Sequence, residues 1–159
     1  MARTVESRQL LYAFTSAHMV PDTDVAGLGA VIRTPRRHTV RKTHATACTT
    51  DPVVAAYEAI KLALREAREM GARAVVVYTD NEAVLHQLDK TVRVDPEQLA
   101  RHLETRSLLN QFHRAQVLRA SPDNNEPAHE LAMQAWQEAG GEALDAPELP
   151  LTWAGTGTG

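Results

Sequence analysis

A long helix followed directly by an apolar strand is the feature that most constrains how this chain can fold. Asp51-Pro52 supplies a helix cap and a first-turn proline, and apolar residues then recur every three or four positions as far as residue 70. Gly71 ends this amphipathic helix, and the strand AVVVYTD follows at 74–80. Its continuous apolar run is typical of a central strand buried on both faces. A strand before the helix would be joined to 74–80 by a right-handed crossover.

The segments on either side complete a sheet. Residues 10–17, 27–34 and 38–48 predict three strands, and the short turns between them favour an antiparallel meander. The third mixes polar with β-branched residues, which indicates an edge strand. After residue 80 the pattern predicts helices at 81–88 and 96–112, a strand at 113–120, a turn-rich loop at 121–127 and a last helix at 128–140.

The predicted fold is therefore α/β, with a mixed five-stranded sheet flanked by helices. Three strands are antiparallel and two are crossover strands. At 159 residues the chain predicts one domain, residues 9–140, between a flexible N-terminus, residues 1–8, and a mobile C-terminal tail, residues 141–159.

Net charge and cysteine content limit the range of possible functions and cellular locations. The formal net charge is -3, so no global basic field attracts nucleic acid, although a local basic patch is compatible with it. A single cysteine excludes an internal disulfide and fits a reducing compartment, so we expect a cytoplasmic protein. No apolar run is long enough to span a membrane, and the start of the sequence lacks a signal-peptide pattern.

Asp80 is the first candidate functional residue, because it stands at the tip of the apolar strand. Ligands of open α/β sheets bind at the carboxyl ends of strands. The same carboxylate could instead cap the helix that begins near Asn81. One acid alone does not hold a pair of divalent cations, so a catalytic role for Asp80 requires further acidic residues beside it.

Residues 55–88 carry a resemblance that supplies candidate partners. They read Ala55-Ala56-Tyr57-Glu58-Ala59-Ile60, then Gly71, a strand and Thr79-Asp80-Asn81. The last helix contains Asn125-Glu126-Pro127-Ala128-His129-Glu130-Leu131-Ala132, and the first strand reads YAFTSA. In order and spacing these segments resemble the ribonuclease H family, in particular its reverse-transcriptase-like branch, from residue 10 to about residue 138.

The resemblance implies four metal-binding carboxylates, and most of them are missing. The matching positions are Thr15, Ala56, Asp80 and His129, of which only Asp80 is an acid. Two-magnesium chemistry needs several converging carboxylates. We therefore expect a degenerate site, no cofactor and no enzymatic activity.

Substitute acids are the route by which activity could survive. Glu58 lies two residues past Ala56, a rotation of about 200° on a helix, so it faces away. Asp22 and Asp24 stand in a loop and could reach inward. With them the chain would be an active ribonuclease H that depends on Mg²⁺ or Mn²⁺.

Three functions stay open at this point. The first is a non-catalytic nucleic-acid-binding module for an RNA/DNA hybrid or other nucleic acid. Its candidate contacts are a basic edge that includes Arg33, together with Arg36, Arg37, Arg41, Lys42, Asn81 and Asn125. The second is a domain that binds a protein partner or a second copy of itself, which the low aromatic content favours. The third is the active ribonuclease H.

Overall fold

The computed structural model describes residues 9–20, 22–140, 153–154 and 156–158. Its main sheet has five strands in the order β3-β2-β1-β4-β5. The strands are β1 (Leu10–His18), β2 (Val25–Arg33), β3 (Thr39–Cys48), β4 (Ala74–Thr79) and β5 (Arg114–Arg119). β1, β2 and β3 pair antiparallel, whereas β4 pairs in parallel with both β1 and β5. The predicted mixed sheet is confirmed, with β3 at an edge.

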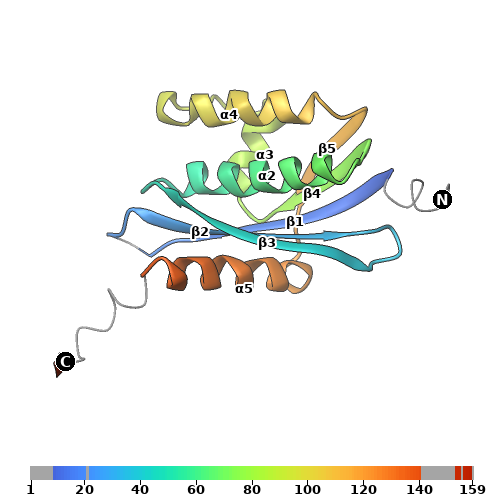
Figure 1. The fold of residues 1–159 in the computed structure, drawn as a ribbon. Helices are drawn as coiled ribbons and strands as arrows, with labels where there is room; N and C mark the ends of the chain where they lie inside the picture. Colours follow the sequence, from blue (N-terminus) through green and yellow to red (C-terminus); the bar gives the residue numbers. More distant parts are fainter. Residues whose placement is uncertain (1–8, 21, 141–152, 155, 159) are drawn as a thin grey trace.

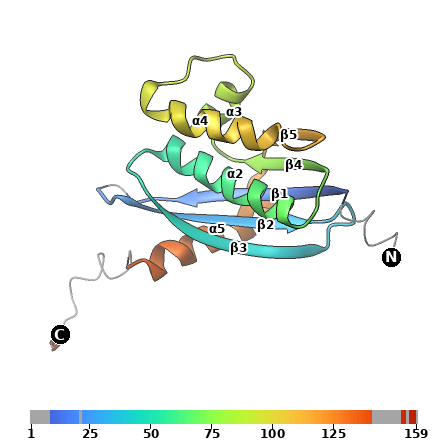
Figure 2. The same ribbon diagram turned by 45° about the horizontal axis from the view of Figure 1, so that its top comes forward.

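Helices cover both faces of the sheet, but unequally. The helices are α2 (Pro52–Glu69), α3 (Glu82–Leu88), α4 (Pro96–Leu109) and α5 (Pro122–Glu138). The first three lie on one side and α5 lies alone on the other (Figures 1 and 2). Two further strands, β6 (Trp153–Ala154) and β7 (Thr156–Thr158), pair with each other. None of the helices within the described ranges is long and apolar enough to cross a membrane. The predicted N-terminal segment 1–8 lies outside the described residues, as does most of the predicted tail, 141–159.

The crossover helix α2 forms where the sequence predicts it and covers the core. Asp51 caps it by accepting a hydrogen bond from the Val53 backbone N–H at 2.8 Å. Its apolar stripe, which includes the fully buried Tyr57 and Ile60, packs on the strand residues that point toward it. Burial of that stripe supplies most of the helix's stability.

The prediction that β4 is buried on both faces is wrong. Val75 and Val77, which face α2, are buried, whereas Val76 and Tyr78 on the opposite face are only half-buried. α5 covers the other half of the sheet: it packs mainly on β2, β1 and β3. The apolar run alone could not show that one face lacks a covering helix.

The predicted loop at 121–127 is also wrong, because these residues form the start of α5. Ser121 caps the helix by accepting from the Asn124 backbone N–H at 3.4 Å, and Pro122 occupies the first helical position. Pro127 stands inside the helix despite its missing N–H. The Asn and Pro residues favour a turn, but the Ser-Pro-Asp start is itself a helix signal.

Two glycines of β2 allow α5 to lie directly on the sheet. A Cβ at Gly27 would stand 1.9 Å from the Ala132 carbonyl oxygen, and one at Gly29 would stand 2.1 Å from that of Ala128. Both distances are far below van der Waals contact, and both neighbours are backbone atoms that cannot rotate away. Only glycine therefore fits at these positions.

A buried polar network joins the three helices on the other face. The Tyr57 hydroxyl donates to the side-chain oxygen of Gln87 and lies 2.9 Å from His102 Nδ1. Gln87 in turn donates to Gln98 at 2.7 Å, and Gln98 donates to Asp51 at 3.1 Å. Burial raises the pKa of Tyr57 to about 12 and lowers the pKa of His102 below 6.5. The network therefore holds α2, α3 and α4 with both rings uncharged.

We expect Gly29→Ala to lower the free energy of unfolding by about 2–4 kcal/mol, because α5 must move away from the sheet to admit the methyl group. Urea unfolding followed by circular dichroism measures this. Thr46→Ala, an exposed change on neighbouring β3, is the control and should stay within about 0.5 kcal/mol of the wild type. Equal stability of Gly29→Ala and the wild type would contradict the close approach.

Acid should weaken the network. The pKa of His102 is lower in the folded than in the unfolded chain, so the unfolded chain binds more protons as the pH falls below about 6.5, and the free energy of unfolding falls with it. The lowered pKa of His18, caused by burial and by neighbouring His129, acts in the same direction. His102→Gln should reduce this fall in stability between about pH 7.5 and about pH 5.5 in urea titrations. His38→Gln, in an exposed turn, should leave it unchanged.

Candidate functional site

The candidate site is a pocket of about 260 Å³ at the carboxyl ends of two neighbouring parallel strands. β1 and β4 end side by side, so residues far apart in the sequence meet there. The pocket is lined from β1 and the loop after it by Thr15, Ser16, Ala17 and Met19, from α2 by Pro52, Ala56 and Ala59, and from the end of β4 by Thr79, Asp80 and Asn81.

Three of the four positions that match the family's carboxylates line this one pocket. Asp80 is exposed at the tip of β4. Thr15 is 1% exposed, and its hydroxyl donates to the Tyr78 carbonyl oxygen at 2.7 Å, which ties β1 to β4. Ala56 is 6% exposed and contributes only a methyl group. The register proposed from the sequence therefore brings these positions together, with one carboxylate among them.

The fourth position, His129, comes from α5 and lies beside the pocket rather than in its lining. Its Nδ1 stands 3.3 Å from the Ser16 hydroxyl oxygen, and Ser16 does line the pocket. The His129 ring also meets His18 edge to face, with 5.6 Å between ring centroids. These contacts give His129 a structural partner on β1.

The two predicted asparagines both make structural hydrogen bonds near the pocket. Asn81 caps α3 by accepting from the Val84 backbone N–H at 3.0 Å, and it lines the pocket. The capping role considered for Asp80 therefore belongs to Asn81. Asn125 is 3% exposed and donates to the Thr15 carbonyl oxygen at 2.9 Å, which fixes the start of α5 against β1.

The predicted basic residues do not reach the pocket. Arg36 and Arg37 lie exposed in the turn between β2 and β3, and Lys42 is exposed on β3. Arg41 is engaged elsewhere, because it pairs with Glu66 of α2 at 2.7 Å and with Glu69 at 3.4 Å. The role of these residues in nucleic-acid binding stays a prediction.

The substitute acids are also outside the lining. Glu58 faces α4, as expected from its helical rotation, and it pairs with Arg101 at 2.7 Å and Lys61 at 3.2 Å. Asp22 and Asp24 are exposed in the loop between β1 and β2. The hydroxyls of Ser16 and Thr79 were missed as pocket residues, although both adjoin residues that the family match had singled out.

A two-magnesium centre does not fit the pocket lining. Each Mg²⁺ prefers several carboxylate or phosphate oxygens. Asp80 is the lining's carboxylate, and its other polar groups are neutral hydroxyl and amide groups. Across the part of the chain that the structure describes, no group of three or more His, Cys, Asp or Glu side chains is placed to hold a metal ion. We assign no metal-dependent step to these residues alone.

The sheet order and a pocket at the ends of β1 and β4 define an RNase H-like domain. A profile of the reverse transcriptase-like family matches residues 14–135, and the chain belongs to that family. No curated protein has a significantly similar sequence.

Solved structures share this fold. The N-terminal RNase H domain of a Mycobacterium tuberculosis protein, fused to maltose-binding protein, has a TM-score of 0.77 and 23% identity over 84% of this chain and 98% of that chain. RNase H1 from the archaeon Halobacterium salinarum has a TM-score of 0.77 and 22% identity, covering 81% and 98%. LC11-RNase H1, in complex with an RNA/DNA hybrid, has a TM-score of 0.70 and 23% identity, covering 82% and 97%.

These comparisons correct one expectation. The prediction that the chain is not an enzyme is contradicted, because solved structures that share its fold include RNase H domains and RNase H1 proteins. The count of carboxylates at four matching positions led to that prediction. It gave less weight to the alternative in which acids of other segments, such as Asp22 and Asp24, complete the site. The resemblance to the ribonuclease H family itself is confirmed.

The convergence of the matching positions can be tested by adding acids. We expect the triple variant Thr15→Asp, Ala56→Glu, His129→Asp to gain Mg²⁺-dependent stability of about 1–3 kcal/mol at saturation, because bound metal stabilises the folded state. Thermal unfolding with and without Mg²⁺ measures it. The matched control carries Asn, Gln and Asn at the same positions. An equal response of both variants would show that the three positions do not form one cation site.

Proposed function

We propose that this chain is a ribonuclease H that takes an RNA/DNA hybrid at the pocket beside Asp80 and cleaves its RNA strand. The observation that carries the proposal is the position of Asp80. It stands at the carboxyl end of β4, in a pocket formed with β1 and α2, within a domain of the reverse transcriptase-like family. Relatives of the same fold include an RNase H1 solved with such a hybrid.

The pocket's lining combines apolar residues with polar groups that could contact a nucleic-acid backbone. Ser16, Thr79 and Asn81 line the pocket together with Asp80, and α2 contributes only the small side chains of Ala56 and Ala59 beside Pro52. Neutral hydroxyl and amide groups can hydrogen-bond phosphate oxygens and 2′-hydroxyls without repelling them. Asp80 would then be the pocket's acidic group facing the scissile strand.

Cleavage would need acids from beyond the described lining, and the loop between β1 and β2 is their best source. Met19 of this loop lines the pocket. The Thr49 backbone N–H donates to the Asp24 carbonyl oxygen at 2.9 Å, which holds the loop beside the start of α2. Pro52, three residues after Thr49, also lines the pocket. Asp22 and Asp24 are therefore the substitute acids that we propose.

The test is cleavage of a labelled RNA/DNA hybrid with Mg²⁺ or Mn²⁺. We expect Asp80→Asn to lower the cleavage rate by about 100-fold or more, the contribution typical of a positioned catalytic group. Asp24→Asn should lower it as well, since the loop completes the site. Asp95→Asn is the matched control, because Asp95 is exposed before α4 and makes no side-chain cap hydrogen bond.

Other outcomes would contradict separate parts of the proposal: cleavage, the role of Asp80, or hybrid binding. A hybrid that is bound but never cut, with either cation, would contradict cleavage and leave hybrid binding. Cleavage that survives Asp80→Asn would place the chemistry elsewhere on the chain. Absence of both binding and cleavage would contradict the proposal entirely.

A further inference from the structure

The face of the sheet that α5 leaves uncovered carries a second hollow. α5 lies on the β1–β2–β3 side, and its first turn stops at Asn125, which bonds to the Thr15 carbonyl. Beyond that point the side chains of β1 and β4 that face away from α2 are only half-buried. Leu118 of β5, opposite Tyr78 in the register, is 42% exposed.

Three aromatic rings gather on this open face. The Phe14 and Tyr78 rings are stacked, with 4.7 Å between centroids and 9° between planes. The Tyr12 ring lies 6.4 Å from Tyr78, tilted by 34°. The guanidinium of Arg33 stands 5.2 Å from the Phe14 ring centroid, on neighbouring β2. Two of the chain's three tyrosines and one of its two phenylalanines thus meet at a half-exposed surface, although aromatic residues make up only 4% of the chain.

These rings form the floor of a hollow of about 290 Å³, which we call the aromatic hollow. Its lining is Tyr12, Phe14 and Tyr78 from the sheet, Arg33, Thr34, Pro35 and Arg37 from the end of β2 and the turn after it, and Asn124 from α5. Two of these residues are cations and none is acidic. Within the described residues, neither arginine has a carboxylate at ion-pair distance.

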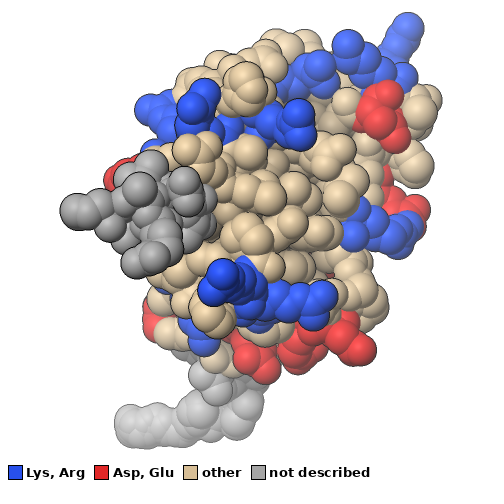
Figure 3. Space-filling model, turned by 90° about the vertical axis from the view of Figure 1, so that its right-hand side faces the viewer, with Lys and Arg blue, Asp and Glu red and all other residues tan. Residues whose placement is uncertain are grey.

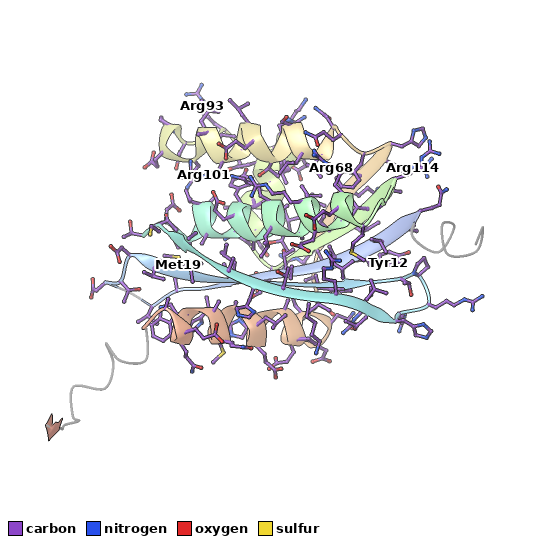
Figure 4. All side chains as sticks on the ribbon, viewed as in Figure 1. Tyr12, Met19, Arg68, Arg93, Arg101 and Arg114 are labelled. Atoms are coloured by element: carbon purple, nitrogen blue, oxygen red, sulfur yellow. The ribbon has the colours of Figure 1, made fainter. Side chains whose placement is uncertain are left out.

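The hollow lies at one end of the molecule, where charges of both signs occur. Figure 4 places Tyr12 near the end of the molecule where Arg68 and Arg114 also lie. Figure 3 looks onto that end and shows groups of Lys and Arg side chains and groups of Asp and Glu side chains around an uncharged area. The lining of the hollow itself holds two arginines and no acid, so it is locally positive in a chain whose net charge is negative.

We propose that the aromatic hollow binds a nucleobase of a single-stranded nucleic acid. The base would stack on the Tyr12 or Tyr78 ring, because Phe14 is already stacked on Tyr78 and approached by Arg33. The adjoining phosphates would bind Arg33 and Arg37. Aromatic rings on an open sheet, bordered by cations, recognise unpaired bases in this way. A duplex keeps its bases stacked inside, so its bases cannot reach the rings. Two arginines without a neighbouring acid favour a polyanion over a peptide.

The aromatic hollow is distinct from the pocket beside Asp80. Side chains alternate along a strand, so Phe14 and Tyr78 face the hollow, whereas Thr15 and Thr79, the next residues, are buried toward the pocket side. Binding in the hollow therefore does not depend on cleavage of a hybrid. A chelator in the assay removes metal-dependent cleavage from the measurement altogether.

The experiment is fluorescence anisotropy of a short labelled DNA single strand, compared with a strand of equal length whose bases are removed. Tyr12→Leu and Tyr78→Leu keep apolar volume but remove a ring, and each should weaken binding about 5- to 150-fold, the range for removal of one base–aromatic stack. The abasic strand should bind weakly to every form of the protein.

The arginines are tested separately with a variant that leaves the rings in place. Arg33→Gln/Arg37→Gln should weaken binding and flatten the dependence of log affinity on log salt by roughly 0.7 for each phosphate that is no longer neutralised. Arg65→Gln/Arg93→Gln, two exposed arginines outside the lining, is the matched control and should bind like the wild type. Thermal unfolding confirms that each variant is folded.

Three results would overturn the proposal. Equal affinity for abasic and normal strands would show that the bases are not recognised. Equal weakening by both arginine pairs would show non-specific charge attraction. Binding of a proline-rich peptide that depends on Tyr12 and Tyr78, with no affinity for the single strand, would make the occupant a peptide.

Discussion

The contact between α5 and β2 at Gly27 and Gly29 determines how the rest of the molecule is arranged. Because a Cβ at either glycine would collide with the α5 backbone, the helix can lie on the sheet only along this line. That position sets Asn125 against Thr15 and His129 beside Ser16. It also leaves β4 and β5 uncovered on the same face. One close approach therefore both supports the pocket beside Asp80 and exposes the aromatic hollow.

Most of the fold could be predicted because its signals are local. The cap at Asp51, the stripe of α2 and the apolar run of β4 each depend on neighbouring residues in the sequence. The wrong predictions concern contacts between segments that are distant in the sequence. The half-exposed Tyr78 follows from where α5 lies, and the helical start of α5 needed its cap and the Asn125–Thr15 contact to outweigh the turn-forming residues. Neither fact is contained in the periodicity of one segment.

In the candidate site, too, local features could be predicted from the sequence, whereas contacts between distant segments could not. The family register placed Thr15, Ala56 and Asp80 in one pocket because strand and helix periods fix which residues face it. The partners of charged and polar side chains were harder to predict. Arg41 looks as free as Arg37 in the sequence, yet it pairs with Glu66, which stands 25 positions away on a helix that packs nearby. The sequence likewise could not show that Asn81, rather than Asp80, caps α3.

The pocket beside Asp80 and the aromatic hollow share strands β1 and β4. They lie on opposite sides of these strands because successive side chains point to alternate faces of a sheet. On β1, Phe14 and Thr15 are neighbours in the sequence but face opposite sides of the sheet, and Tyr78 and Thr79 repeat this on β4. Asp80 therefore lines the pocket on one side, whereas Asn124 and the three rings line the aromatic hollow on the other. The open half of the sheet thus offers an unpaired base a surface on the opposite side of β1 and β4 from the pocket where the hybrid is proposed to lie. A covering helix over β4 would remove that surface, and the glycine-fixed position of α5 keeps it open.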